Sequence, residues 1–367
     1  MTRQIGCLLL AAALCALTGC GSAAEAASDG ATSQTASSAV QTVQETEEIP
    51  SSTQQVFAMD TYMTVTAYGD QAAAAVSAAV EEIQRLDALW SVGESDSEIS
   101  ILNDSGSILL SEETAELVER SLTLYEETEG AFDITIYPLM VEWGFTSGEY
   151  QVPTQERIDE LLELVGSDKL EYDAETCQLT LPEGMAIDLG GIAKGYVSSH
   201  IMDVFEEYGV VSGMVSLGGN VQTYRTKTDG SLWRVGIENP DATVEALSGV
   251  DYVGVLSVED KAVITSGGYE RYFEEDGVTY HHILDPSTGS SARSGLLSVT
   301  IVSEDGTLAD GLSTSLFVMG KERALEYWAA HSDEFDAVLV EEDGSVTITG
   351  GLKDCFESDL EYTCVEN

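Results

Sequence analysis

The sequence predicts an α+β fold made of two closely packed halves. Strand-like stretches are interrupted by a few long segments of helical periodicity, without a regular βαβ order. No Gly- or Pro-rich linker divides the chain after residue 55, and no internal repeat with a period of roughly 20 to 50 residues is visible. With 367 residues the chain can form one large domain, or two sub-domains that share a cleft.

The first residues predict export. An apolar run, Ile5 to Leu17, follows Arg3 and leads into LTGC, which ends at Cys20. The run is too short to span a bilayer. It resembles a bacterial lipoprotein signal, which would make residues 1–19 the signal peptide and Cys20 the lipidated first residue. An ordinary secretory peptide cut nearby is the alternative. We therefore expect a protein anchored by lipid to the extracytoplasmic face of the cell membrane.

Residues 20–55 predict a flexible tether. The stretch from Gly21 to Gln55 contains no Lys, Arg, aromatic residue or Cys, and it is rich in Ala, Ser, Thr, Gln and Glu. Such a composition cannot bury enough apolar surface to fold. We therefore expect the folded domain over residues 56–367.

The charge of the chain excludes one class of partner. The formal net charge is -50, whereas a nucleic-acid-binding protein needs a basic face. The same charge disfavours electrostatic docking on an anionic membrane, so the lipid would be the anchor. An anionic ligand would need local compensation from a lysine, a helix N-terminus or a metal ion.

The elements of the folded part follow from periodicity. The alternating stretch VFAMDTYMTVTAYG predicts a strand over residues 56–69. Helical spacing predicts helices over 72–90 with an Asp70 cap, over 112–129 before Gly130, over about 154–166, and around Val197 to Tyr208. Further strands are predicted in GMAIDL (184–189), GMVSLGGN, WRVGIENP, YVGVLSV, AVITSGGY and SVTIV, and a last α/β segment in ADGLSTSLFVMG and DAVLVEED.

The stretch DLGGIAKGY, residues 188–196, suggests a phosphate site. It is not a P-loop, because its lysine precedes the last glycine, and it lacks the glycine spacing of the dinucleotide fingerprint. Gly190 and Gly191 nevertheless allow close approach of a ligand to the backbone, and Lys194 adds a charge at a helix N-terminus. A purely structural strand-to-helix turn is an equal interpretation.

Three other segments carry candidate groups. Asp310 and Thr314 are four residues apart in a predicted helix, so both oxygens could bind a hard cation, although Asp310 also suits a helix N-terminus. His282, in YHHILDP, could act as a base or contact a ligand, or be structural. Asp133, in GAFDITIYPLM, could bind a ribose or ring edge, or cap a strand end. Cys355 and Cys364 could form a disulfide, with free thiols as the alternative.

Eight segments in this order resemble the FAD:protein FMN transferase family, the ApbE type. The segments are MDT (59–61), DSEISILN (96–103), GAFDITIYPL (130–139), DLGGIAKGY (188–196), SLGGN (216–220), ITSGGYERYF (264–273), HILDPSTG (282–289) and ADGLSTSLFVMG (309–320). The resemblance implies an ApbE-like, T-fold-like domain of two lobes with an FAD cleft between them. It also implies transfer of FMN from FAD to a Thr or Ser of a target protein, with release of AMP.

The resemblance also implies site residues and partners. Mg²⁺ would be bound by Gly191, Asp310, Ser313 and Thr314, FAD would contact Met59, Ala131, Phe132, Asp133, Asp188, Lys194 and Leu284, and His282 would assist catalysis. Many relatives carry a flavin-stacking aromatic residue where this chain has Gly93, so Trp90 or Tyr62 would have to replace it. The acceptors would belong to membrane redox complexes or extracellular electron-transfer systems.

Three alternatives follow from the same residues. Water in place of the acceptor would make the protein an FAD pyrophosphatase, and loss of turnover would make it a flavin-binding lipoprotein. The tether sequence SDGATSQT also resembles the context of flavin-acceptor threonines, so Thr32 could be modified by the enzyme itself. A chance match is the alternative in such an Ala-, Ser- and Thr-rich segment.

Overall fold

The computed structural model describes residues 49–367. Its helices are α1 (Ala72–Trp90), α2 (Glu98–Ser105), α3 (Glu112–Glu127), α4 (Tyr137–Glu142), α5 (Gln155–Leu162), α6 (Ala193–Glu207), α7 (Gly306–Met319) and α8 (Lys321–Ala330). Short 3₁₀ turns are η1 (Ile134–Ile136), η2 (Ser167–Lys169), η3 (Glu245–Leu247) and η4 (Gly350–Leu352). Together with the sheets described next, these elements confirm the α+β class.

The main sheet has nine strands in the order β1-β2-β6-β7-β10-β15-β16-β17-β19. They are β1 (Ser51–Ala58), β2 (Thr61–Tyr68), β6 (Ser212–Leu217), β7 (Asn220–Tyr224), β10 (Ala262–Gly267), β15 (Leu296–Ser303), β16 (Phe335–Glu341), β17 (Val346–Thr349) and β19 (Tyr362–Val365). All neighbours are antiparallel except β17 and β19, which are parallel. Short hairpins join β1 to β2, β6 to β7 and β16 to β17, whereas the other connections contain the helices or the smaller sheets.

Four smaller sheets complete the fold. They are β8 (Trp233–Glu238) with β9 (Tyr252–Val258) and β18 (Phe356–Glu357), β3 (Ser107–Leu109) with β4 (Glu171–Asp173) and β5 (Gln178–Thr180), β11 (Tyr272–Glu275) with β12 (Val278–His281), and β13 (Leu284–Asp285) with β14 (Ser290–Ser291).

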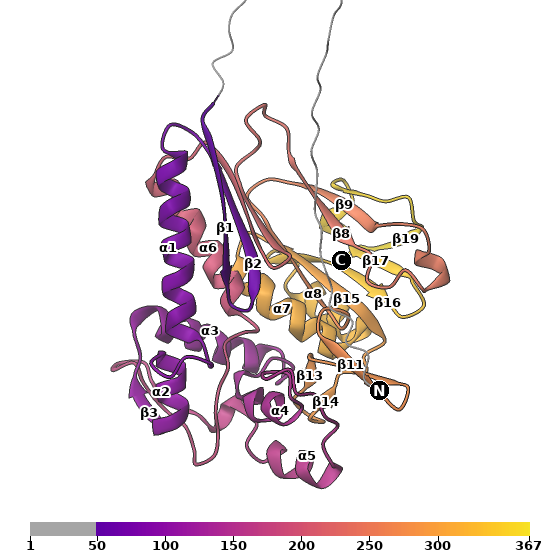
Figure 1. Ribbon diagram of the computed structural model, residues 1–367. Coiled ribbons are helices and arrows are strands. Elements are labelled where there is room, and N and C mark those ends of the chain that lie inside the picture. The colour runs from indigo at the N-terminus through magenta and orange to yellow at the C-terminus, as the bar shows by residue number, and fades with distance from the viewer. Residues whose placement is uncertain (1–48) are drawn as a thin grey trace, which may run out of the picture. The chain divides into compact units, whose positions relative to one another are not determined.

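The main sheet is covered on both faces. Because side chains alternate along a strand, Ala262 and Ile264 of β10 join the core beneath α1, α6 and α7, while Val263 between them faces the core shared with β8 and β9. Strand β16 repeats the pattern with Leu339 and Val338. Helices and a second sheet thus pack on opposite faces of the central strands (Figure 1). This explains why the sequences of these strands are nearly continuous apolar runs.

Helices α2 to α5 lie at the lower end of the view in Figure 1, away from β8 and β9. Helices α4 and α5 share a small core of their own, which includes Leu139, Trp143 and Ile158. Leu284 of β13 belongs to the same core, and the Trp143 indole N–H donates to the Gly289 carbonyl at 2.8 Å. The segment that contains His282 is therefore held by this part of the fold.

The helix predictions are confirmed at α1, which has the expected bounds, and closely at α3, α5, α6 and α7. One detail is wrong. Asp70 does not cap α1, because the helix begins after Gln71 without a side-chain cap. Helix α5 has a side-chain cap, because the Thr154 hydroxyl accepts from the Arg157 N–H.

Three strand boundaries are also wrong. Residues 56–69 form a hairpin, because the chain reverses at Met59 and Asp60, a turn without the usual Gly or Asn signal. Strand β1 begins at Ser51, so residues 51–55 belong to the fold and not to the tether; backbone pairing with β2 compensates for their exposed polar side chains. Residues 184–189 form no strand, and a side chain bonds their backbone instead.

The structure tests the possible disulfide but does not describe most of the predicted N-terminal segments. Cys177, Cys355 and Cys364 are free, so the disulfide alternative does not hold in this structure. Within residues 49–367 no helix is long and apolar enough to cross a membrane. The signal peptide, the lipidation site Cys20, most of the tether and Thr32 lie outside the described residues.

Candidate functional site

The glycine loop leads into helix α6 and is anchored from two sides. The Asn103 side chain both donates to and accepts from the backbone of Ile187, at 2.9 and 2.8 Å. The next backbone N–H, that of Asp188, donates to the Ile134 carbonyl at 2.9 Å. The Asp188 carboxylate accepts from the Gly190 N–H at 2.7 Å. The loop conformation is thus fixed by hydrogen bonds before any ligand binds.

The segment from Ala131 to Asp133 lies against this loop. Ala131 and Phe132 are buried, and a Cβ on Gly191 would come within 3.2 Å of the Phe132 ring. The Asp133 carboxylate accepts from the N–H and hydroxyl of both Thr135 and Ser167, at 2.6 to 3.3 Å. Asp133 therefore has a structural capping role, but at the 3₁₀ turn η1 and not at a strand end. Its contact with FAD stays a prediction.

Asp310 is the most buried carboxylate among the predicted site residues. It is 4% exposed on α7, and its two oxygens accept separately. The Gly195 N–H donates to Oδ2 at 2.8 Å, and the Asn220 side-chain amide donates to Oδ1 at 2.9 Å. A Cβ on Gly195 would lie 2.5 Å from the Asp310 Cβ. Glycine is required there so that α6 can bring the loop to Asp310.

Ser313 and Thr314 follow Asp310 on the same helix. The Ser313 hydroxyl is within hydrogen-bonding distance of the Asp310 carbonyl, at 2.8 Å, and of the Ser266 hydroxyl, at 2.7 Å. Ser266 also lies 3.2 Å from the Thr314 hydroxyl. Strand β10 thus orients the Thr314 hydroxyl, which the resemblance assigns to the metal, and the side chain of Ser313, whose backbone it assigns there.

Burial and the charge of Lys194 act in opposite directions on the pKa values of Asp188 and Asp310. Burial raises the pKa of Asp310, while Lys194 and the two hydrogen bonds oppose the shift. Burial also raises the pKa of Asp188, against the Gly190 N–H and the charges of Arg271 and Lys194. Within residues 49–367 Lys194 makes no ion pair of its own, so its ammonium group is available to an anionic ligand.

His282 is half-buried at the end of the β11-β12 hairpin. Its Nδ1 lies 3.2 Å from the Arg271 carbonyl, which can only accept, so Nδ1 carries the hydrogen and Nε2 keeps a lone pair. Burial, together with the charge of Arg271, lowers the pKa of His282 to about 3. His281 bonds the Ala292 carbonyl through Nε2. The adjacent histidines, at and just after the end of β12, thus occupy different surroundings.

The Met59-Asp60 turn is another predicted part of the FAD site. Both residues have positive φ, 47° and 59°, which is unusual for residues other than glycine. The Met59 N–H donates to the Asp87 carboxylate at 3.0 Å, which holds the turn in place. The charge of Asp60 acts on the Asp188 carboxyl and raises its pKa, so the turn lies near the glycine loop.

The two candidates for flavin stacking, Trp90 and Tyr62, differ in how exposed they are. Trp90 is 4% exposed, donates to the Thr114 hydroxyl and packs edge-on against Tyr196. It therefore belongs to the core and cannot stack on a ligand without leaving it. Tyr62, beside the Met59-Asp60 turn, is 76% exposed.

Leu284, a predicted FAD contact, is 5% exposed and belongs to the α4-α5 core.

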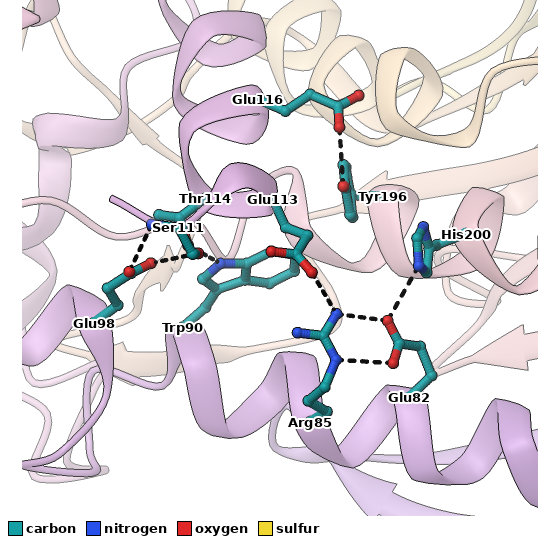
Figure 2. Close-up of polar contacts among 10 residues, drawn as sticks. All are labelled: Glu82, Arg85, Trp90, Glu98, Ser111, Glu113, Thr114, Glu116, Tyr196 and His200. Carbon is teal, nitrogen blue, oxygen red and sulfur yellow. Dashed lines mark hydrogen bonds and ion pairs between the residues drawn. The ribbon is translucent and has the colours of Figure 1, made fainter. Parts of the chain in front are cut away.

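A polar network supports the site from behind helix α6. Figure 2 shows the Arg85 guanidinium between Glu82 and Glu113, with His200 also bonded to Glu82 and Tyr196 bonded to a glutamate of α3. These side chains come from α1, α3 and α6. They tie the helix that follows the glycine loop to its neighbours.

The structure joins most of the predicted groups through hydrogen bonds and charges. The glycine loop contacts Phe132, Gly195 bonds Asp310, and Lys194 acts on Asp188, His282 and Asp310. Two surface hollows, one near Cys355 and one along α6, contain none of the predicted site residues. We therefore locate the site by these contacts.

Sequence reasoning missed three residues that orient the site: Asn103, Asn220 and Ser266. Each lies in a segment that carried the resemblance, so the signal was present. Their roles could not be predicted from the sequence, because each side chain forms a hydrogen bond with a residue at least 47 positions away in the chain.

Comparison with known proteins identifies relatives over most of the chain. Residues 59–339 match the model of the ApbE family. The FAD:protein FMN transferase of Vibrio cholerae is 34% identical over 68% of this chain and 74% of that protein, and the one of Treponema pallidum is 33% identical over 79% and 84%.

Solved structures agree with these matches. The crystal structure of the ApbE protein from Thermotoga maritima is 33% identical, covers 81% of this chain and 96% of its own, and superposes with a TM-score of 0.75. The apo form of the Pseudomonas stutzeri flavinyl transferase ApbE is 28% identical, covers 85% and 98%, and has a TM-score of 0.73. With this fold, this set of site segments and a family match over residues 59–339, the chain belongs to the ApbE family.

Proposed function

We propose that this protein transfers FMN from FAD to a hydroxyl of a Thr or Ser in a target protein and releases AMP. The family match carries the proposal, because residues 59–339 include every predicted metal, FAD and catalytic residue. The relatives at 33 to 34% identity are themselves named FAD:protein FMN transferases. The bond broken is the phosphoanhydride of FAD, and the bond formed joins the FMN phosphorus to the acceptor oxygen.

The donor groups around Asp310 fit a hard divalent cation such as Mg²⁺. The carboxylate of Asp310, the hydroxyl of Thr314 and the backbone carbonyls of Gly191 and Ser313 are all oxygen donors, which Mg²⁺ prefers. Each Asp310 oxygen accepts one hydrogen bond and keeps a further lone pair. A bound cation would neutralise charge on the pyrophosphate oxygens. In a chain with a net charge of -50, such compensation is needed for an anionic substrate.

Lys194 and the loop supply the remaining positive potential. Lys194 is the second residue of α6, and Gly190 and Gly191 precede the helix. The N–H groups of Gly190, Ala193 and Gly195 already donate within the protein, so the charge of Lys194 is the main feature here that favours a phosphate. These groups would bind and orient FAD, so that the phosphoanhydride faces the acceptor.

His282 is suited to take the proton of the acceptor hydroxyl. Its Nε2 lone pair is free, because Nδ1 is held by the Arg271 carbonyl. A pKa of about 3 makes it a weak base in the protein alone. An anionic pyrophosphate nearby would stabilise the imidazolium and raise this pKa, so the base would strengthen when the substrate is bound.

The location of the enzyme is part of the proposal. The signal-like start and Cys20 support a lipid anchor on the extracytoplasmic face of the cell membrane. Acceptors in membrane redox complexes or extracellular electron-transfer systems would be within reach of such an enzyme. Metabolic labelling with a radioactive fatty acid tests the anchor, since Cys20→Ala should abolish labelling and release the protein from membranes.

A direct assay tests the transfer. The purified protein is incubated with FAD, MgCl₂ and a candidate acceptor domain, and the denatured acceptor is examined for covalent flavin fluorescence and mass. We expect an FMN adduct and an equal amount of AMP. AMP without an adduct would instead identify a pyrophosphatase, and tight FAD binding without AMP would identify a carrier.

A further inference from the structure

We infer that Asn220 is a positioning residue, which holds the Asp310 carboxylate in the orientation that binds a divalent cation. The inference rests on the proposed metal role of Asp310. Asn220 itself would not contact the cation, and it acts only through its hydrogen bond.

The geometry around Asp310 fixes both carboxylate oxygens. Asn220 donates from Nδ2 to Oδ1 at 2.9 Å, and the Gly195 N–H donates to Oδ2 at 2.8 Å. Two donors on different oxygens prevent rotation about the Cβ–Cγ bond. Both side chains are only 4% exposed, so water cannot replace the amide easily. Gly195 contributes backbone, so Asn220 is the side chain that sets the orientation.

The SLGGN segment explains how Asn220 reaches this place. Gly218 and Gly219 form a two-residue turn with φ of 64° and 102°, and Leu217 pairs with Asn220 across it. A Cβ on Gly218 would lie 2.6 Å from the Thr61 hydroxyl oxygen, so the turn packs against the residue that follows the Met59-Asp60 turn. The glycines thus permit a tight turn against β2, and β7 begins with the asparagine that bonds α7.

The residue type at position 220 follows from the chemistry. An amide donates a hydrogen bond to a carboxylate without adding charge, whereas an aspartate would place a second anion beside Asp310. An alanine would leave Oδ1 without a partner and free to rotate. Outer partners of metal ligands typically change metal affinity by roughly 10- to 100-fold when removed. We expect an effect of that size at Asn220.

The test measures binding of MgCl₂ or MnCl₂ alone to the purified full-length protein by calorimetry, without FAD. Asn220→Ala should weaken cation binding roughly 10- to 100-fold. Asn220→Ser, which keeps a shorter donor, should lose less. In the FAD reaction, Asn220→Ala should raise the Mg²⁺ concentration needed for half-maximal AMP release, while kcat at saturating Mg²⁺ changes less than the affinity.

Asn239 provides a matched control. Its side-chain amide donates to the carbonyls of Leu247 and Val250, both at 2.8 Å, and its side-chain oxygen accepts from the Asp241 N–H, so its side-chain hydrogen bonds involve no site segment. Asn239→Ala should lower the Tm and leave cation affinity unchanged. Equal losses of cation affinity in the Asn239 and Asn220 variants would overturn the inference, because general destabilisation would then explain both.

Asp310→Ala separates this inference from the metal site itself. If that variant binds the cation as well as the wild type does, the proposed metal site is wrong and the inference fails with it. If Asp310→Ala abolishes binding but both Asn220 variants bind within about twofold of wild type, the metal site stands and the inference is overturned. Circular dichroism of each variant verifies folding, and Asn220→Ser is the measured variant if the alanine does not fold.

Discussion

Asp133 and Asp310 are both buried carboxylates that the sequence singled out, yet their surroundings differ. Four donors from Thr135 and Ser167 surround the Asp133 carboxylate. Asp310 has fewer donors, chiefly the Gly195 N–H and the Asn220 amide, and the nearby positive charge is that of Lys194. Asp133 therefore has the environment of a structural cap, whereas Asp310 keeps free lone pairs next to a cation. Burial alone does not distinguish the two, but the number of donors does.

The largest expected effect is the loss of reaction in Asp310→Ala. Removing the only carboxylate among the proposed metal ligands should lower AMP release at least about 100-fold. The variant also leaves the Gly195 N–H and the buried Asn220 amide without their acceptor, which costs about 1–3 kcal/mol in the free energy of unfolding. Removing a carboxyl whose pKa burial raises offsets part of this cost, so the Tm should fall moderately. Activity assays and thermal melts check both parts. Near-normal activity with intact folding would contradict the proposed site.

The counterpart, Asp133→Ala, should act mainly on stability. It leaves the Thr135 and Ser167 donors without their acceptor, at a cost of about 1–3 kcal/mol in the free energy of unfolding. Urea unfolding at pH 7 measures this loss. A variant with unchanged stability but a much higher KM for FAD would show that Asp133 binds substrate, and the contrast with Asp310 would not hold.

The pH dependence of stability should reveal His282. Its pKa of about 3 lies below the ordinary value of 6.5, so the unfolded chain binds the proton more tightly than the folded one. Between those values, stability should therefore fall as the pH falls. The raised pKa values of Asp188 and Asp310 act in the opposite direction. Comparing unfolding of the wild type and His282→Gln at pH 7 and pH 5 isolates the histidine, since the variant should lose less stability on acidification.

The smallest effect should come from Arg85→Ala. The guanidinium bonds Glu82 and Glu113 at 2.7 and 2.8 Å, but its side chain is 45% exposed, so each pair contributes little (Figure 2). We expect a loss of about 0.2–1 kcal/mol in the free energy of unfolding, and less at high salt. Unfolding at two salt concentrations measures it. A large loss of activity without loss of stability would instead assign the network a role in the site.

The sequence predicted long helices well and some strand boundaries poorly. Helix α1 carries a clear apolar face and has the expected bounds. The hairpin turn at Met59 and Asp60 was missed, because neither residue is a usual turn former and tertiary contacts hold both at positive φ. Residues 184–189 have the composition of a strand, but their backbone pairs with the Asn103 side chain.

By itself, the sequence determined the α+β class, the main helices and the segments that carry the resemblance, because these depend on local periodicity and on residue types at short spacing. Only the tertiary structure decided that Gly195 and Asn220 donate to Asp310, that Asp133 is saturated by Thr135 and Ser167, and that Trp90 is buried. The physical reason is that hydrogen bonds between distant segments depend on how helices and hairpins pack, and no local pattern records that packing.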